Sequence, residues 1–257
     1  MASRKSKFES GKSGMPTPVF RDLSEAQRNA NPETGAKAAI FDIGATLVTG
    51  PPVAPNKVIA RLLGGVEAAE VASVIMTRQF VCADEVCRAL EARFGRMSDE
   101  ARLGIAKLWK MQSEAAFELD GAGETVLALK RRGVRIGLLS DIWNPYYEGV
   151  KKALPEVVRA ADAIVLSCRT GARKPDPANF LAALDELNVE PEQAVMVGDT
   201  YEHDILPALQ LGMRAVWVLA RPDREANSII AVLNGRSPTP TAAVPSIAHV
   251  AALKLWQ

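Results

Sequence analysis

The stretch KAAIFDIGATL, residues 37–47, sets the fold class of this chain. It begins with an unbroken apolar run, residues 38–41, that ends at the carboxylate of Asp42. A strand that is buried on both faces has this pattern, and such strands belong to parallel sheets covered by helices. We therefore expect residues 37–42 to form a strand of such a sheet, with Asp42 at its carboxyl end.

The rest of the chain repeats this strand pattern between helical segments. Similar apolar runs occupy residues 134–140, 163–167, 194–199 and 214–219. Helical signals lie between them at residues 122–132, 177–187 and 204–211, with a proline or a glycine at their ends. Alternating strands and helices predict right-handed crossovers. The sequence thus predicts an α/β fold whose core is a Rossmann-like parallel sheet.

One long segment, residues 58–119, breaks the alternation because its signals are helical throughout. Apolar residues recur at helical spacing in 66–80, 84–94 and 98–119. Turn formers flank the segment, with Gly50 and two prolines on one side and Gly121 on the other. We expect an inserted all-helical cap domain. The expected boundaries are 53–119 for the cap, and 37–52 with 120–257 for the core.

Two further segments lack this patterning. Residues 1–36 are rich in Ser, Lys, Asn, Gly and Pro, which predicts a mobile or loosely packed N-terminal extension. Residues 221–241 are polar and contain prolines, which indicates a loop. We expect a short strand near residues 243–244 and a terminal helix after this loop.

The charge balance excludes several classes of protein. The 257 residues include 31 basic and 30 acidic side chains, a formal net charge of +1. The net charge therefore does not favour binding to nucleic acid or to an anionic membrane. No apolar run approaches the roughly 20 residues of a membrane-spanning helix, and no signal-peptide stretch follows the first residues. We expect a cytoplasmic protein with no nucleic-acid or membrane partner; the sequence leaves the oligomeric state open.

The three cysteines do not indicate a metal site. Cys82, Cys87 and Cys168 lack metal-ligand spacing, and His203 and His249 do not complete a zinc site with them. We expect three reduced, packed thiols.

Polar residues gather at the ends of the predicted strands. Asp42, Ser140 and Asp199 each close an apolar run, and Lys174 lies in a loop before a predicted helix. Ligands of open parallel sheets bind at the carboxyl ends of the strands. Each of these residues alone could cap a helix or turn the chain. Four together at such places indicate a functional site.

These residues lie in motifs that resemble the haloacid dehalogenase (HAD) superfamily of aspartate-nucleophile hydrolases, of the helical-cap (C1) type. The resemblance runs from residue 38 to about residue 213. The four motifs are FDIGATL at 41–47, the strand that ends in Ser140, KPDP at 174–177 and GDTYEHD at 198–204. Their order and strand context agree with that superfamily.

The resemblance implies a phosphatase that works with Mg²⁺ on a small phosphorylated substrate. A phosphate monoester repels an attacking carboxylate unless a divalent cation neutralises both. By resemblance, Asp42 is the nucleophile that forms an aspartyl-phosphate, and Asp204 orients Lys174 or a metal-bound water. The implied catalytic residues are Asp42, Ser140, Lys174 and Asp204. The implied metal ligands are Asp42, the carbonyl of Gly44, and Asp199. The implied phosphate-binding residues are Ile43, Gly44, Thr46, Ser140, Asp141 and Lys174.

Gly44 departs from the superfamily pattern. Phosphatases of this superfamily usually carry a second aspartate there, which protonates the leaving oxygen. General acid–base assistance is typically worth about a hundred- to ten-thousand-fold in rate. A substrate whose leaving group needs little protonation, such as a sugar 1-phosphate or an acyl phosphate, would fit Gly44. Candidates to supply the proton instead are Asp141 and the run Tyr201, Glu202 and His203.

Three alternatives stay open. A carbon–halogen hydrolase needs no acid, but relatives of that kind lose the metal-binding aspartate that Asp199 retains here. A phosphonate hydrolase would need a cap lysine, for which Lys57 is the nearest candidate. A binding or scaffold protein with little turnover would keep the fold without the chemistry.

The cap is expected to contact the leaving group of the substrate. Candidate substrate contacts from the cap are Arg78, Lys107, Trp109 and Lys110.

Overall fold

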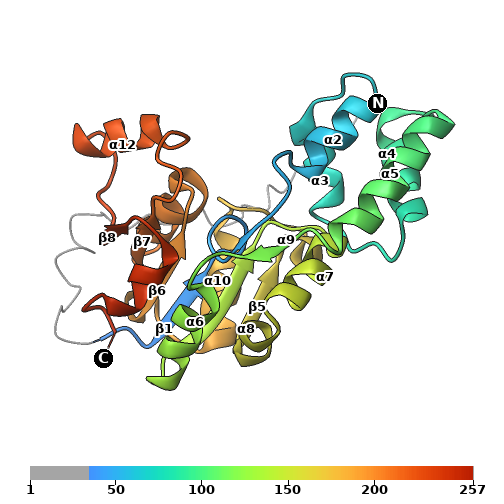
Figure 1. Cartoon of the computed structure of the whole chain (residues 1–257). Coiled ribbons are helices and arrows are strands. Elements are labelled where there is room, and N and C mark those ends of the chain that lie inside the picture. The colour runs from blue at the N-terminus through green and yellow to red at the C-terminus, as the bar shows by residue number, and fades with distance from the viewer. Residues whose placement is uncertain (1–34, 257) are drawn as a thin grey trace, which may run out of the picture.

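Six parallel strands form the main sheet of the computed structural model, which describes residues 35–256 (Figure 1). The strands lie in the order β5-β4-β1-β6-β7-β8, and every pairing between neighbours is parallel. Their bounds are β1 Ala38–Phe41, β4 Arg135–Ser140, β5 Ala163–Leu166, β6 Ala194–Gly198, β7 Arg214–Val218 and β8 Ala242–Val244. The predicted α/β fold with a Rossmann-like sheet is confirmed.

The register of β1 brings the predicted functional residues to one edge of the sheet. Phe41 lies opposite Leu138 of β4 and opposite Val197 of β6. Because all three strands run in the same direction, the residues that follow them meet at the carboxyl edge. Asp42 therefore lies between the ends of its two neighbouring strands.

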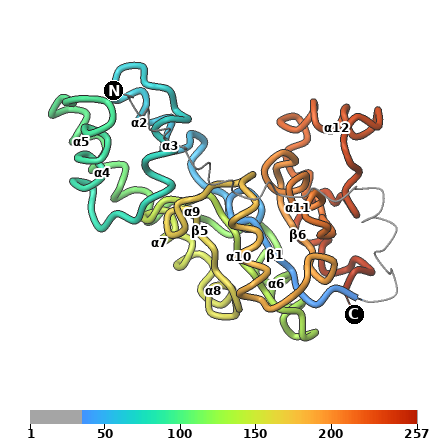
Figure 2. Tube along the Cα trace, turned by 180° about the vertical axis from the view of Figure 1, so that it is seen from behind, coloured from blue at the N-terminus to red at the C-terminus, as the bar shows by residue number. Residues whose placement is uncertain are grey.

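Helices cover both faces of the sheet, because side chains alternate along each strand (Figures 1 and 2). Ala39 and Phe41 point to one face, and Ala38 and Ile40 to the other. The first face packs against α6 Ala122–Arg131, α7 Asn144–Ala153, α8 Pro155–Ala160 and the 3₁₀ helix η3 Ile247–Ala252. The second face packs against α10 Pro177–Leu187, the π-helical turn η2 Tyr201–Ile205 and α11 Leu206–Gln210. Two short helices, α9 Ser167–Thr170 and η1 Pro191–Gln193, complete the core.

Four helices form the insertion at the carboxyl edge of the sheet, drawn blue to green in Figure 1. They are α2 Pro55–Leu62, α3 Ala68–Ile75, α4 Ala83–Phe94 and α5 Asp99–Gln112. Their apolar faces enclose a core of their own around Ile75, Leu90 and Ile105. Trp143, from the loop after β4, joins this core and donates from Nε1 to Oε1 of Gln112 (3.0 Å). The insertion is all-helical, as the sequence predicts.

The chain enters and leaves the helical insertion through a small antiparallel pair of strands. β2 Val48–Thr49 pairs with β3 Phe117–Glu118. The helix expected to run to residue 119 therefore ends earlier, at Gln112. Strands of two residues show no measurable periodicity, so no sequence pattern predicts this pair.

Other segments also differ from the expectations. The stretch 221–241, expected as a loop, contains α12 Ala226–Leu233, from which Ile229 and Val232 pack against the second face. The helix expected at 204–211 begins as the π-helical turn η2. The terminal helix is the 3₁₀ helix η3.

The ends of the described chain meet in space. The backbone N–H of Ala36 donates to the carbonyl of Leu255 (2.8 Å). Residues 1–34 of the predicted extension lie outside the described residues.

The expectation of three packed cysteines is wrong at one position. Cys87 and Cys168 are buried free thiols, but Cys82, at the cap of α4, is exposed rather than packed. Within residues 35–256, no helix has the length and apolar character needed to span a membrane.

Candidate active site

Asp42 is fixed by the sheet and by the tight loop that follows it. Its backbone N–H donates to the carbonyl of Val197 on β6 (2.9 Å). The loop closes where the carbonyl of Ile43 accepts from the N–H groups of Leu47 (2.9 Å) and Val48 (3.0 Å). The loop thus holds the buried carboxylate of Asp42 at the centre of the carboxyl edge.

Lys174 joins two carboxylates. Its Nζ lies 2.7 Å from Oδ1 of Asp42 and 2.6 Å from Oδ1 of Asp204, and all three side chains are buried. Both backbone groups of Lys174 are bound as well. The N–H of Lys174 donates to Oδ1 of Asp141 (3.0 Å), and the carbonyl of Lys174 lies 3.1 Å from Nδ1 of His203. Lys174 is therefore held against Asp42 by contacts with two other loops.

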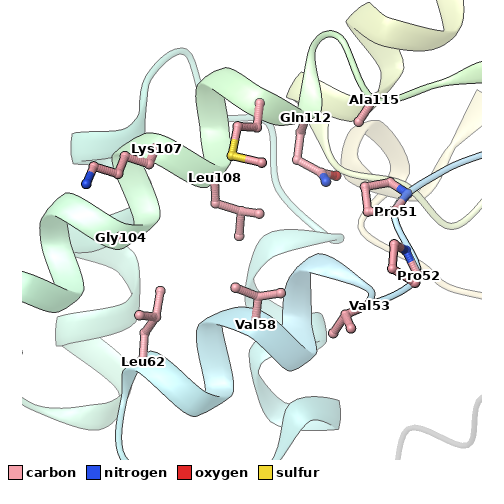
Figure 3. A pocket seen from close by; sticks show the side chains of 11 residues that line it. Pro51, Pro52, Val53, Val58, Leu62, Gly104, Lys107, Leu108, Gln112 and Ala115 are labelled. Carbon is pink, nitrogen blue, oxygen red and sulfur yellow. The ribbon is translucent and has the colours of Figure 1, made fainter.

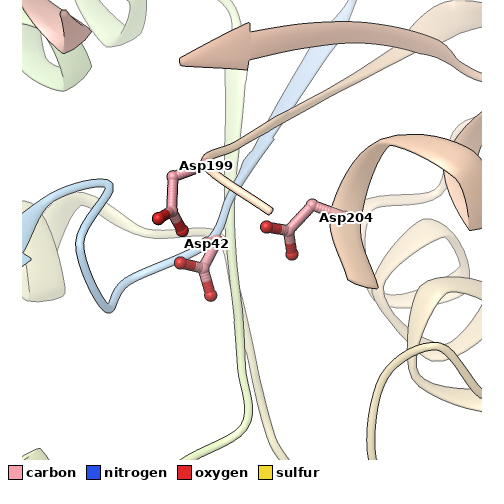
Figure 4. Close-up of side chains that lie close together, drawn as sticks. All are labelled: Asp42, Asp199 and Asp204. Carbon is pink, nitrogen blue, oxygen red and sulfur yellow. The ribbon is translucent and has the colours of Figure 1, made fainter. Parts of the chain in front are cut away.

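Asp199 and Asp204 complete a triad of carboxylates with Asp42, and the three carboxyl groups lie close together in Figure 4. One oxygen from each lies within 4.8 Å of the others. Asp204 is held by Lys174 and by the N–H of Thr200, which donates to its Oδ2 (3.0 Å). A carboxylate triad of this kind is the oxygen-rich donor set that Mg²⁺ prefers.

Glycine at position 198 makes the triad possible. A Cβ built there would lie 2.5 Å from Cβ, Cγ and Oδ2 of Asp204. The end of β6 therefore approaches Asp204 more closely than any side chain allows.

The electrostatics of the triad favour an added cation. Burial is the main cause that raises the pKa of Asp42 to about 6, against an ordinary value of 3.8. Burial likewise raises the pKa values of Asp199 and Asp204. Burial disfavours the charged amine of Lys174, but the charges of Asp204 and Asp42 outweigh it and raise its pKa. With Lys174 and Arg221 as the adjoining cations, three carboxylates face two positive groups. The residues present therefore fit a divalent cation.

Arg221 is one of three pocket-lining residues that the sequence did not predict; the others are Arg173 and Thr200. The guanidinium of Arg221 forms an ion pair with Asp199, which also has its carbonyl bound by Nε1 of Trp217 (3.1 Å). Arg221 follows β7, the strand next to β6. The sequence signal is a basic residue just after a predicted strand, at the start of the segment 221–241 that is expected as a loop beside the site.

Most of the predicted site residues line one pocket of about 230 Å³, which is the candidate catalytic pocket. Its lining includes Asp42, Gly44, Ser140, Asp141, Lys174, Asp199 and Asp204, together with Arg173, Thr200, His203 and Arg221. Ile43 and Thr46 are not among the lining residues. The Ile43 side chain packs in the core, and the hydroxyl of Thr46 is buried without a partner. The side chains of these two predicted phosphate-binding residues therefore do not reach this pocket.

The candidate replacement acids have different surroundings. Asp141 lines the pocket but is held by the N–H of Lys174 and by Arg173, whose Nε lies 3.3 Å from its Oδ2. Tyr201 is buried and donates its hydroxyl to the carbonyl of Pro238 (2.6 Å). Glu202 is exposed. His203 alone of the run 201–203 lines the pocket.

The cap candidates lie away from the catalytic pocket. Lys107 lines a separate, mostly apolar pocket of about 380 Å³ between α2 and α5 (Figure 3). Trp109 packs edge-on against Trp143, with ring centroids 5.6 Å apart. Arg78 and Lys110 are exposed and do not line the catalytic pocket.

Comparison with known proteins gives the family. The model of the family described as haloacid dehalogenase-like hydrolase matches residues 36–212. The chain therefore belongs to the haloacid dehalogenase-like hydrolase family.

Curated relatives agree with this assignment, and solved structures have a similar fold. The chain is 35% identical to a phosphoglycolate phosphatase of Rhodospirillum rubrum over 202 residues, which cover 70% of this chain and 78% of that protein. It is 38% identical to a glyceraldehyde 3-phosphate phosphatase of Pyrococcus furiosus over 100 residues, 39% of this chain and 41% of that protein. The chain thus matches less than half the length of the Pyrococcus protein. The fold is similar to that of 2-haloacid dehalogenase from Pseudomonas syringae, with a TM-score of 0.55, 22% identity, and coverage of 84% of this chain and 96% of that chain.

The contact between Gly198 and Asp204 gives a first prediction. In Gly198→Ala, the new Cβ must displace Asp204, which Lys174 and Thr200 hold in place. We expect the free energy of unfolding to fall by about 1–3 kcal/mol, measured by urea denaturation. The matched control is Gly44→Ala, because a Cβ there meets nothing within 4 Å. Its expected change is within about 0.5 kcal/mol. Equal losses in the two variants would contradict the steric argument.

The raised pKa of Asp42 gives a second prediction. The pKa of Asp42 in the folded protein is about 6, above its ordinary value of 3.8. Protonation of Asp42 therefore stabilises the folded state fully below about pH 3.8, and this stabilisation is lost as the pH rises through about 6. A cation held by the triad would compete with protons for these carboxylates. We therefore expect Mg²⁺ to raise the thermal unfolding midpoint more at about pH 7.5 than at about pH 5. An equal or larger rise at the lower pH, each compared with EDTA, would refute this.

Proposed function

We propose that this protein is a Mg²⁺-dependent phosphatase that hydrolyses a small phosphorylated metabolite through an aspartyl-phosphate on Asp42. The observation that carries the proposal is the buried contact of Lys174 with both Asp42 and Asp204, beside Asp199. A carboxylate nucleophile that meets a phosphate dianion needs positive charge on both sides of the reacting atoms. The catalytic pocket supplies it through Lys174 and through the triad that would hold the metal.

The residues have separate parts in this reaction. Asp42 attacks phosphorus, and the bond from phosphorus to the leaving oxygen breaks. Water then attacks the phosphorus of the aspartyl-phosphate, which releases inorganic phosphate and restores Asp42. Asp42, Asp199 and the Gly44 carbonyl would hold Mg²⁺, which supplies charge neutralisation when bound.

Lys174, Ser140 and Asp204 support the transfer. Lys174 balances the negative charge of the carboxylate and of the phosphoryl group. Ser140, buried at the end of β4, lines the pocket and would donate its hydroxyl to a phosphoryl oxygen. Asp204 orients Lys174, to which it is bound directly. The cap, proposed as residues 53–119 over a core of 37–52 and 120–257, excludes water during the transfer.

The proton for the leaving oxygen has no donor at position 44. Of the residues that line the pocket, His203 is the best placed to replace it. A carbonyl only accepts hydrogen bonds, so the contact of Nδ1 with the Lys174 carbonyl requires the proton on Nδ1. Nε2 is then the ring atom left to exchange a proton with the leaving oxygen. A leaving group that needs little protonation remains the other solution.

The geometry disfavours the alternatives. A carbon–halogen hydrolase has no use for a cation site, whereas Asp199 and Asp204 are buried beside Asp42. A phosphonate hydrolase needs a cap amine at the reacting carbon, but Lys57 and Lys107 do not line the catalytic pocket. A scaffold without turnover does not need Lys174 buried between two carboxylates.

Hydrolysis of para-nitrophenyl phosphate tests the proposal, because nitrophenolate leaves without protonation. We expect release that depends on Mg²⁺, stops in EDTA, and falls by about a thousandfold or more in Asp42→Asn, which cannot act as the nucleophile. Folding of the variant is checked by its thermal unfolding midpoint. Metal-independent release, or full activity of Asp42→Asn, would contradict the proposal.

An aspartate introduced at position 44 is expected to increase phosphatase activity. A Cβ at Gly44 meets nothing within 4 Å, so an aspartate fits there. We expect Gly44→Asp to raise kcat on alkyl phosphates, whose leaving groups need a proton, by about tenfold or more. Para-nitrophenyl phosphate should gain little. Gly44→Asn has nearly the same shape but cannot supply the proton, and is the matched control. Equal effects of the two variants would show that the missing acid is not what limits the rate.

A further inference from the structure

A second cleft, of about 730 Å³, adjoins the catalytic pocket. The two share Gly44 and Arg221 as lining residues. The rest of the cleft is lined by the loop at 49–54 and the start of α2, by Gln112 and Tyr146, and by Arg224. Its volume lies in the range of small-molecule sites. A substrate whose phosphoryl group is at Asp42 would extend its leaving group past Gly44 into this cleft.

The charge of the cleft is one-sided. Three of its lining residues are basic, Lys57, Arg221 and Arg224, and none is acidic. Arg221 is paired with Asp199, but Lys57 and Arg224 form no ion pair with any residue from 35 to 256. Asp223, the acidic neighbour of Arg224, is exposed and does not line the cleft. The two unpaired cations are therefore available to a ligand.

The backbone and the uncharged side chains do not oppose this positive charge. The N-cap of α2 is Ala54, which has no side-chain cap, and the first turn of α2 holds no acidic residue. The positive end of the helix dipole thus adds to the charge of Lys57. Burial, with the charge of Asp42, raises the pKa of Tyr146 to about 12, so its hydroxyl stays neutral. Among residues 35–256, no acidic side chain lines the cleft.

The two unpaired cations come from different parts of the chain. Lys57 belongs to the helical insertion, whereas Arg224 follows β7 of the sheet. They line one cleft next to the leaving-group side of the reaction. We infer, on the basis of the proposed function, that the substrate is a phosphate monoester whose leaving group carries a second anionic group, which Lys57 and Arg224 bind. A carboxylate or a second phosphate shares this chemistry.

Three aryl phosphates test the inference: phenyl phosphate, 4-carboxyphenyl phosphate and 1,4-phenylene bisphosphate. We expect kcat/KM to be about tenfold or more higher for at least one charged substrate than for phenyl phosphate. The charged substrate that gains more identifies a carboxylate or a phosphate as the preferred group. In Lys57→Gln and Arg224→Gln this preference should fall by about three- to tenfold, with the activity on phenyl phosphate little changed.

Lys110→Gln is the matched control, because Lys110 is an exposed lysine of the insertion that lines neither pocket. It should keep the full preference. Equal kcat/KM for the three substrates, or equal losses on all three in the cleft variants, would overturn the inference and leave the phosphatase proposal standing. No Mg²⁺-dependent hydrolysis of any of them would contradict the proposed function, and the inference with it.

Discussion

The buried ammonium of Lys174, in contact with Asp42 and Asp204, is the interaction on which the rest of the site depends. Two carboxylates and one amine in a water-poor place are costly to bury unless their charges and hydrogen bonds are satisfied. The fold meets this demand with groups from three loops. Thr200 donates to Asp204, and Asp141 and His203 hold the backbone of Lys174. The contacts that keep Lys174 in place thus also keep it against the carboxylate of Asp42.

The sheet order explains why these loops meet. β1 lies between β4 and β6, so the residues after these three strands share one edge. Gly198 then lets Asp204 approach the end of β6. Among residues 35–256, Asp199 forms its one ion pair with Arg221, which also lines the second cleft. The pocket that contains the triad and the second cleft therefore adjoin each other and share Gly44 and Arg221 as lining residues.

Much of this arrangement could be predicted from the sequence, because it depends on strong local patterns. Buried parallel strands produce apolar runs, so the strands that end near Asp42, Ser140 and Asp199 were expected at their observed places. The β2–β3 pair was missed since two residues carry no period. α12 was missed because its apolar residues lie within a polar, proline-containing segment. The pairing of Arg221 with Asp199 spans 22 positions and depends on the path of a loop, which no local pattern records.

In the proposed reaction, Asp42 itself takes the phosphoryl group. Quenching the Mg²⁺-loaded protein with acid during turnover of a ³²P-labelled monoester, followed by peptide mapping, tests it most directly. We predict an acid-stable, base-labile label on the peptide that contains Asp42, lost in Asp42→Asn and reduced by chase with unlabelled substrate. Turnover without any label on that peptide would contradict the account, because water would then attack the substrate directly.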